Sequence, residues 1–317
     1  MLKLVSDFIK GGVFMTKNKT TTGVLCALFA NVIFGFSFLF SKTALSVSTP
    51  LIILAARFTV AFLFLNILLV LGVFKIDFKS FLKSPTLWLM GLAQPFLYFI
   101  FELYGLSLVS SAVSGVIIAL VPVAVMLYSN LILKEKATPM QWVFTLISII
   151  GVSAISISSN NGEKTYTLGI LLLLGAVICA AAFNLLSRKQ SSEFSPFERT
   201  YVMFFIGFIG FNATAVFSLK QNFLTILKQS FCQIEFIISV IYLAIISSVL
   251  AFLLYNFATS NISAVMASSF SNIIPIVTVL AGLFILKEDL KVLDICFCGL
   301  IILGVWGVNK FTKKNKI

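Results

Sequence analysis

Long apolar stretches separated by short polar connections make up most of the chain. Each is about 20 residues long, the length that an α-helix needs to cross the hydrocarbon core of a bilayer. The pattern therefore predicts an all-α membrane protein with ten transmembrane helices, at residues 22–41, 51–73, 86–107, 111–133, 140–158, 168–187, 199–218, 236–257, 264–286 and 292–310.

Two connections carry an amphipathic pattern of their own. In residues 74–85, lysines recur every four positions beside an apolar side, which predicts a short helix lying on the membrane surface. Residues 220–231 resemble it on the opposite face. The connections near 107–111 and 258–263 are very short, so their flanking helices are expected to form antiparallel hairpins.

The second half of the chain repeats the first. A shift of 153 positions relates residues 116–152 to residues 269–305, and a shift of 146 relates the beginnings of the two halves. The larger shift pairs Pro122 with Pro275, Ile132-Leu133-Lys134-Glu135 with Ile285-Leu286-Lys287-Glu288, and Gly151-Val152 with Gly304-Val305; the smaller pairs Gly23, Ser41, Lys42 and Pro50 with Gly169, Ser187, Arg188 and Pro196.

This duplication predicts how the chain is organised. We expect a first repeat over residues 21–159 and a second over 160–311, between an N-terminal segment, 1–20, and a basic tail, 312–317. Each repeat would hold five helices. Because five is odd, the second repeat must cross the membrane in the opposite sense, as in many transporters with inverted repeats. Met15 is expected to be the true start of translation.

Composition agrees with an integral membrane protein. Hydrophobic residues make up 60% of the chain and charged residues only 11%, too few to cover a soluble globule. The net charge of +12 is typical of basic residues flanking membrane spans, so nucleic-acid binding is not expected. Histidine is absent, which removes His-based catalysis and metal ligation. The cysteines Cys296 and Cys298 are two positions apart on one helix and cannot share an ion.

The basic residues alternate between the two faces. Because positive charge gathers on the cytoplasmic side, the alternation predicts ten spans in the cell (inner) membrane with both termini cytoplasmic. The cytoplasmic set is Lys3, Lys10, Lys17, Lys19, Lys75, Lys79, Lys83, Lys134, Lys136, Arg188, Lys189, Arg199, Lys310, Lys313, Lys314 and Lys316, and the sparser outer set is Lys42, Lys164, Lys220, Lys228, Lys287 and Lys291.

These motifs resemble the EamA family of the drug/metabolite transporter superfamily. The resemblance rests on the two five-helix repeats and on motifs in order: Phe34-Gly35-Phe36-Ser37-Phe38 followed by Lys42, then Pro50 and Arg57, then Pro122 with Lys134-Glu135 and Pro275 with Lys287-Glu288. Phe34 stands where many members carry Trp. The resemblance implies an alternating-access carrier with a central cavity, most often an exporter of amino acids or related metabolites.

Two charges inside the spans are the strongest candidates for function. Arg57 and Glu102 each lie about six residues from the outer end of their helices, at similar depth. A charge within the bilayer usually faces a cavity or a partner. Glu102 could couple protons or bind an amine with Arg57 beside it. The alternatives are a structural ion pair, or an arginine that reaches the outer headgroups.

Three further features have both a structural and a functional interpretation. Pro122 and Pro275 break their helices at matching positions and are predicted hinges, although repeats would also inherit a packing kink. Lys42 matches the family's lysine on the first helix, but a lysine at a helix end also reaches the interface. For the two Lys-Glu pairs, capping of the helix ends is favoured over gate contacts.

Polar and aromatic side chains deep in the spans are predicted to line the substrate cavity. Close helix packing is the alternative for the small residues among them. A cavity of this kind suits neutral, zwitterionic or apolar metabolites better than phosphorylated ones. The predicted substrate-binding set is Asn31, Phe34, Ser37, Lys42, Gln94, Tyr98, Ser114, Asn184, Tyr201, Tyr255, Ser268 and Asn272.

The sequence thus predicts a secondary transporter that moves small organic metabolites, most often by export. No nucleotide-binding loop of the GxxxxGK[ST] type occurs, so an ion or substrate gradient would supply the energy. No cofactor, metal or protein partner is predicted. A metabolite importer, a channel, and a membrane-embedded enzyme or lipid-handling protein are the alternatives; an enzyme would need a convergent catalytic set that the spans lack.

Overall fold

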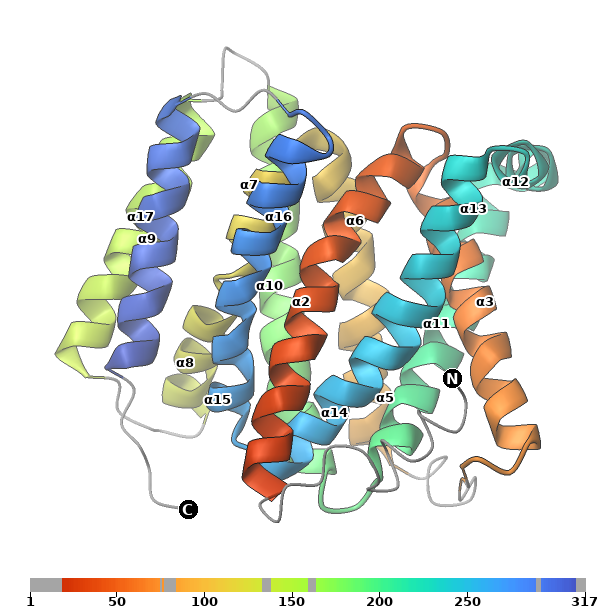
Figure 1. Ribbon diagram of the computed structural model, residues 1–317, viewed down its shortest axis with the longest axis horizontal. Coiled ribbons are helices and arrows are strands. Elements are labelled where there is room, and N and C mark those ends of the chain that lie inside the picture. Colours follow the sequence, from red (N-terminus) through yellow and green to blue (C-terminus); the bar gives the residue numbers. More distant parts are fainter. Residues whose placement is uncertain are drawn as a thin grey trace.

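The computed structural model describes residues 19–74, 76, 84–132, 138–158, 164–288 and 292–311, and within these ranges every regular element is a helix. Figure 1 shows them as a bundle of roughly parallel and antiparallel rods. The elements are α2 (Lys19–Leu45), α3 (Pro50–Val70), α5 (Pro85–Gly91), η1 (Leu92–Leu97), α6 (Tyr98–Leu108), α7 (Ser111–Ile118), α8 (Val121–Ile132), α9 (Pro139–Ser158), α10 (Lys164–Gln190), α11 (Pro196–Leu219), η2 (Lys220–Asn222), α12 (Phe223–Phe231), α13 (Ile234–Ile241), η3 (Tyr242–Leu250), α14 (Ala251–Asn261), α15 (Ala264–Ser269), η4 (Phe270–Asn272), α16 (Ile273–Phe284) and α17 (Val292–Lys310).

The helices have the length and composition of a multi-pass membrane protein. In the described part of the chain, eight helical runs are long and apolar enough to cross a bilayer, and Pro139–Ala154 and Ile295–Val308 are shorter apolar helices. The predicted all-α membrane class is confirmed. The count of ten spans remains a prediction.

Two spans depart from regular α-helix where the hydropathy pattern did not predict it: η1 is a kink between two helices, and η3 is a π-helical segment. In η1, Gln94 leaves helical geometry (φ −145°, ψ 119°) next to Pro95, which has no N–H to donate. The second segment, η3, has no proline. Residues 92–97 correspond to 245–250 under the shift of 153, so the two halves deviate from α-helix at matching positions. A π-segment such as η3 frequently occurs at a functional site.

The two predicted proline breaks are present. The helical run that contains Pro122 is interrupted at Ala119 and Leu120, between α7 and α8. The run that contains Pro275 passes through the 3₁₀ segment η4 before α16 begins. A proline cannot donate to the carbonyl four residues earlier, which explains an interruption on its N-terminal side. A hinge function for these prolines is still a prediction.

Packing places α2, α10, α14 and α16 near the middle of the bundle. The pair α9 and α17 packs together at one side, and α12 lies at the opposite outer edge beside α13, near one end of the bundle (Figure 1), where a short surface helix was predicted over 220–231. Most of the matching segment 74–85 lies outside the described residues, as do Lys134, Glu135, Met15 and the basic tail.

The first helix of each half contacts the end of the third. Lys42 Nζ donates to the carbonyl oxygens of Leu106 (3.0 Å) and Val109 (2.7 Å), where α6 ends. Arg188 donates to the carbonyl oxygen of Thr259 (2.8 Å), near the end of α14. The shifts of 146 and 153 relate Lys42 to Arg188 and Leu106 to Thr259. Each cation therefore satisfies carbonyls that a helix C-terminus leaves without intrahelical partners.

Candidate functional site

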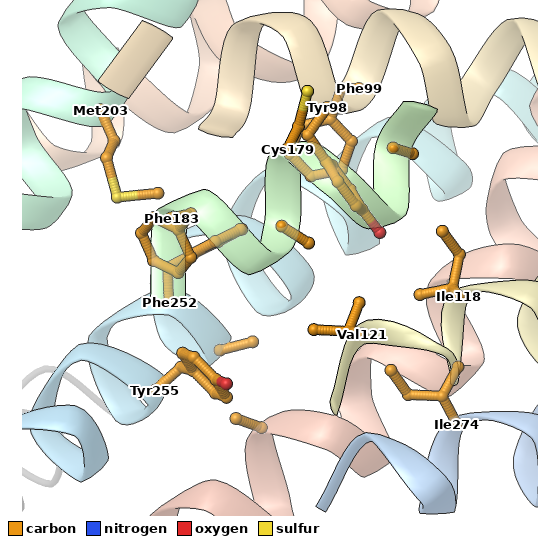
Figure 2. Packing of buried hydrophobic residues seen from close by; sticks show 14 of the residues in the cluster. Tyr98, Phe99, Ile118, Val121, Cys179, Phe183, Met203, Phe252, Tyr255 and Ile274 are labelled. Atoms are coloured by element: carbon orange, nitrogen blue, oxygen red, sulfur yellow. The ribbon is translucent and has the colours of Figure 1, made fainter. Parts of the chain in front are cut away.

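A cavity of about 50 Å³ lies at the centre of the bundle, between helices of both halves. Figure 2 shows Phe183, Phe252 and Tyr255 on one side of this region and Ile118, Val121 and Ile274 on the other. The lining residues are Asn31, Phe34, Ser37 and Phe38 from α2, Arg57 from α3, Gln94 from η1, Tyr98, Phe99 and Glu102 from α6, Ile118, Val121, Ala180, Phe183 and Asn184 from α7, α8 and α10, Phe252 and Tyr255 from α14, and Ser271 and Ile274 from η4 and α16.

The two halves supply matching positions to this cavity. Most lining residues have a counterpart, under one of the two shifts, that also lines it. The shift of 146 pairs Phe34 with Ala180, Ser37 with Phe183 and Phe38 with Asn184, and the shift of 153 pairs Phe99 with Phe252, Glu102 with Tyr255, Ile118 with Ser271 and Val121 with Ile274. The cavity thus lies where the duplicated segments face each other.

Arg57 is buried and bound by neutral groups. It is 2% exposed; its Nε donates to Ser248 Oγ at 2.8 Å and its guanidinium also donates to Ser247 Oγ at 3.3 Å. The guanidinium carbon lies 4.1 Å from the ring centroid of Phe99, a cation–π distance. Both serines belong to η3, so the π-helical segment of the second half positions the arginine of the first.

Glu102 is also buried, and only one of its carboxyl oxygens has a partner. Tyr98 Oη donates to Glu102 Oε1 at 3.3 Å, whereas Oε2 has no hydrogen bond within the described part of the chain. In those residues Arg57 and Glu102 make no direct ion pair; they interact electrostatically around the shared cavity. An unpaired buried oxygen is costly, and this one has a free position that can accept from a donor.

The second half contributes neutral polar groups. Tyr255 Oη donates to Asn184 Oδ1, and the amide nitrogen of Asn184 donates to Ala180 O at 2.8 Å. Asn31 on α2 donates in the same way to Ala27 O at 2.7 Å. Both amides can therefore accept hydrogen bonds through their oxygens, and the oxygen of Asn184 already accepts from Tyr255.

Aromatic rings form much of the remaining wall. Phe34 meets Phe252 edge to face with centroids 5.1 Å apart, and Phe183 stacks on Tyr255 at 6.2 Å. These rings give the cavity an apolar surface between its polar groups.

Seven of the predicted substrate-binding residues line the cavity: Asn31, Phe34, Ser37, Gln94, Tyr98, Asn184 and Tyr255. Arg57 and Glu102 join them. The other predicted residues lie outside it. Lys42 binds the end of α6, and Tyr201 donates to Asn66 Oδ1 (3.0 Å) between α11 and α3.

The three remaining residues lie in or near the broken helices. Ser114 donates to Ser110 O at 2.8 Å within α7, and Ser268 is completely buried in α15. Asn272 follows the cavity residue Ser271 and is partly buried. Next to Ser114, a Cβ on Gly115 would clash with the side chain of Thr278, so small residues bring α7 and α16 close together here, as the packing alternative predicted.

Several cavity residues were not predicted. Phe252 follows from applying the shift of 153 to Phe99, the neighbour of the predicted Tyr98, and Ser271 is the neighbour of the predicted Asn272. Ser247 and Ser248, which hold Arg57 without lining the cavity, look like ordinary small residues in the sequence. Arg199, counted among the cytoplasmic basic residues, is fully buried and donates to Ser187 O (2.7 Å) and Thr259 Oγ1 (3.0 Å). No cluster of three or more metal-ligating side chains occurs in the described ranges.

Comparison with known proteins identifies the family. The sequence model of the EamA-like transporter family matches residues 21–157 and 167–310. The uncharacterized transporter YcxC of Bacillus subtilis is 34% identical over 310 residues, covering 95% of this chain and 97% of that protein. An uncharacterized transporter of Archaeoglobus fulgidus is 27% identical, covering 86% of this chain and 93% of that protein.

The fold has also been seen in a solved structure. A crystal structure 16% identical in sequence superposes with a TM-score of 0.60, covering 90% of this chain and 96% of that one. The arrangement of helices is therefore shared beyond recognisable sequence similarity. The family match over both halves and the 34% identity to YcxC show that the chain belongs to the EamA-like transporter family of the drug/metabolite transporter superfamily, and is a membrane transporter rather than an enzyme.

Proposed function

We propose that this transporter moves small organic metabolites, amino acids or related compounds, out of the cell across the inner membrane. Two inverted five-helix repeats, residues 21–159 and 160–311, would alternately open the central cavity to either face, with both termini cytoplasmic and ten spans in all. The observation that carries the proposal is the lining of one buried cavity by matching positions of both halves. Binding sites at the interface of repeats are typical of such carriers.

The chemistry of the cavity supports a zwitterionic or neutral substrate. The guanidinium of Arg57 can bind a carboxylate, and the unpaired Oε2 of Glu102 can accept from an ammonium group. Aromatic rings would surround an apolar side chain. A phosphorylated compound would need more cationic groups than Arg57 supplies to this lining.

The size of the cavity supports alternating access. A volume of about 50 Å³ holds only a few water molecules. A metabolite can therefore enter only if the two halves move apart, and interruptions at Pro122 and Pro275 supply places where the helices can bend.

The test is counterflow of radiolabelled amino acids into proteoliposomes, with and without an imposed pH gradient. The proposal expects saturable accumulation of a subset of amino acids that excess unlabelled substrate abolishes. Flux that rises linearly with concentration and shows no counterflow would indicate a channel. Absence of counterflow for every amino acid would overturn the proposed substrate class. Uptake by intact cells and by inverted vesicles then distinguishes export from import.

A further inference from the structure

The turn that follows α16 folds a carboxylate back toward the bundle. The Leu286 N–H donates to Ala281 O (3.1 Å) and the Glu288 N–H donates to Gly282 O (3.0 Å). Between them Lys287 has φ +52°, the left-handed conformation that reverses a chain after a helix. The local backbone therefore returns Glu288 to the side of α16 instead of continuing away from it.

The Glu288 carboxylate binds the N-terminus of α7. Its Oε1 accepts from the Ser111 N–H at 2.8 Å and its Oε2 from the Ala112 N–H at 3.3 Å. These N–H groups have no intrahelical acceptor, and the helix dipole favours a negative charge there. A Cβ at Gly282 would lie 2.8 Å from Glu288 Oε2, so the glycine leaves space for the carboxylate.

A third segment adds a positive charge to this contact. Lys42, at the end of α2, interacts electrostatically with Glu288 while its Nζ holds the end of α6. The contact therefore joins α2, α6 and α7, which precede residue 159, to the turn after α16, which follows it. The contact lies at one end of the interface at which α16 packs along both α2 and α7.

We propose that Glu288 is a gate residue, whose bond to the N–H groups of Ser111 and Ala112 holds this end of the transporter closed. The contact joins the first half to the second, so it must break when the halves separate at this end. At each opening the Glu288 carboxylate would give up its two N–H donors on α7 and bind water in their place. The hydrogen bonds to water offset those that are lost, so this end can open and close reversibly. The inference rests on the proposed alternating access, because only a carrier that alternates has to open this end.

The first test measures access to the cavity without using a substrate. Ile118→Cys, in a chain whose native cysteines are replaced by serine, reports reaction with a membrane-impermeant thiol reagent from either face. Cys232 is exposed just after α12, at the same end of the bundle as the gate, because the Ser230 hydroxyl lies 2.7 Å from that of Ser48, which follows α2. Labelling of a chain that retains only Cys232 therefore shows which face of the membrane the gate end occupies. Adding Glu288→Gln should speed labelling of the Ile118→Cys thiol from that face about tenfold.

The control is Glu235→Gln, which neutralises an exposed glutamate at the start of α13, away from the half-buried Glu288. It should leave the labelling rate unchanged. An unchanged rate in Glu288→Gln, with the protein monodisperse in detergent, would overturn the gate. Because labelling needs no transport, this result together with intact counterflow would contradict the gate and leave the proposed function standing.

A cross-link provides a second, independent test. The Cβ position of residue 282 lies 3.2 Å from Ser111 Oγ, close to the geometry of a disulfide. Because a Cβ at residue 282 displaces the Glu288 carboxylate, the double variant Ser111→Cys with Gly282→Cys before oxidation is the reference. Oxidation should abolish the counterflow of this reference and a reductant should restore it, while each single variant is insensitive to oxidation. Full counterflow by the cross-linked protein would show that α7 and α16 do not separate at this end, and would contradict the proposal.

Discussion

The two halves build the cavity from the same positions but with different chemistry. Where the first half has Glu102, the second has Tyr255; where the first has Arg57, the second has Met203. The second half replaces Phe38 and Ile118 with Asn184 and Ser271. Both charges of the described lining therefore come from the first half, whereas the second half supplies only uncharged groups to it. In the proposed mechanism, the near-symmetry of the frame serves the movement of the two halves, and the asymmetric lining orients the substrate.

Replacing Arg57 by methionine, the residue at the matching position of the second half, should have the largest effect on transport. Arg57→Met removes the guanidinium from the cavity lining and leaves Ser247 and Ser248 without their donor. Losing one charged partner of a buried contact predicts a roughly 100-fold fall in counterflow. Arg57→Lys keeps the charge but not the two-pronged geometry, so partial activity is expected. Normal counterflow in a well-folded Arg57→Met protein would remove this residue from the site.

Glu102, the other charged residue of the lining, tests whether transport is coupled to protons. Glu102→Gln keeps the shape of the side chain but cannot release a proton, so transport should lose its dependence on the pH gradient while exchange of substrate persists. Measuring both fluxes in the same proteoliposomes separates the two effects. Undiminished dependence on the gradient would show that protons couple elsewhere.

The serines of η3 should have an intermediate effect. Ser247→Ala with Ser248→Ala leaves Arg57 in place but frees its guanidinium from the second half, and the apparent KM should rise about tenfold with a smaller change in maximal rate. Ser239→Ala is the matched control, because its buried hydroxyl has no partner in the described chain. Equal effects of the two replacements would argue for general loss of packing.

Two tyrosines give the smallest and most specific comparison. Tyr255→Phe removes the hydroxyl that binds Asn184 within the cavity, and a several-fold loss of apparent affinity is expected for one neutral hydrogen bond. Tyr201→Phe removes a hydroxyl bound to Asn66 outside the cavity and should leave affinity unchanged. A larger loss for Tyr201→Phe would contradict the position assigned to the site.

The sequence predicted the helical membrane class from the length of the apolar stretches, and the helix breaks from the positions of the prolines. It predicted the deep polar residues because a polar side chain within an apolar stretch is visible without knowing the fold. It could not separate Tyr201 from Tyr255. Lipid and protein interior are both apolar, so a membrane helix shows little of the amphipathic period that would reveal which side faces the cavity. Nor could it foresee the π-segment η3, which contains no proline and whose Ser247 and Ser248 accept from Arg57.

The most direct test of the central claim is access to the paired positions Ile118 and Ser271. In chains otherwise without cysteine, Ile118→Cys and Ser271→Cys are labelled with an impermeant thiol reagent from each face, with and without a transported amino acid. A single cavity that opens alternately predicts that both introduced cysteines react from both faces and that substrate slows both reactions. Reaction of each cysteine from one face only, unaffected by substrate, would contradict it.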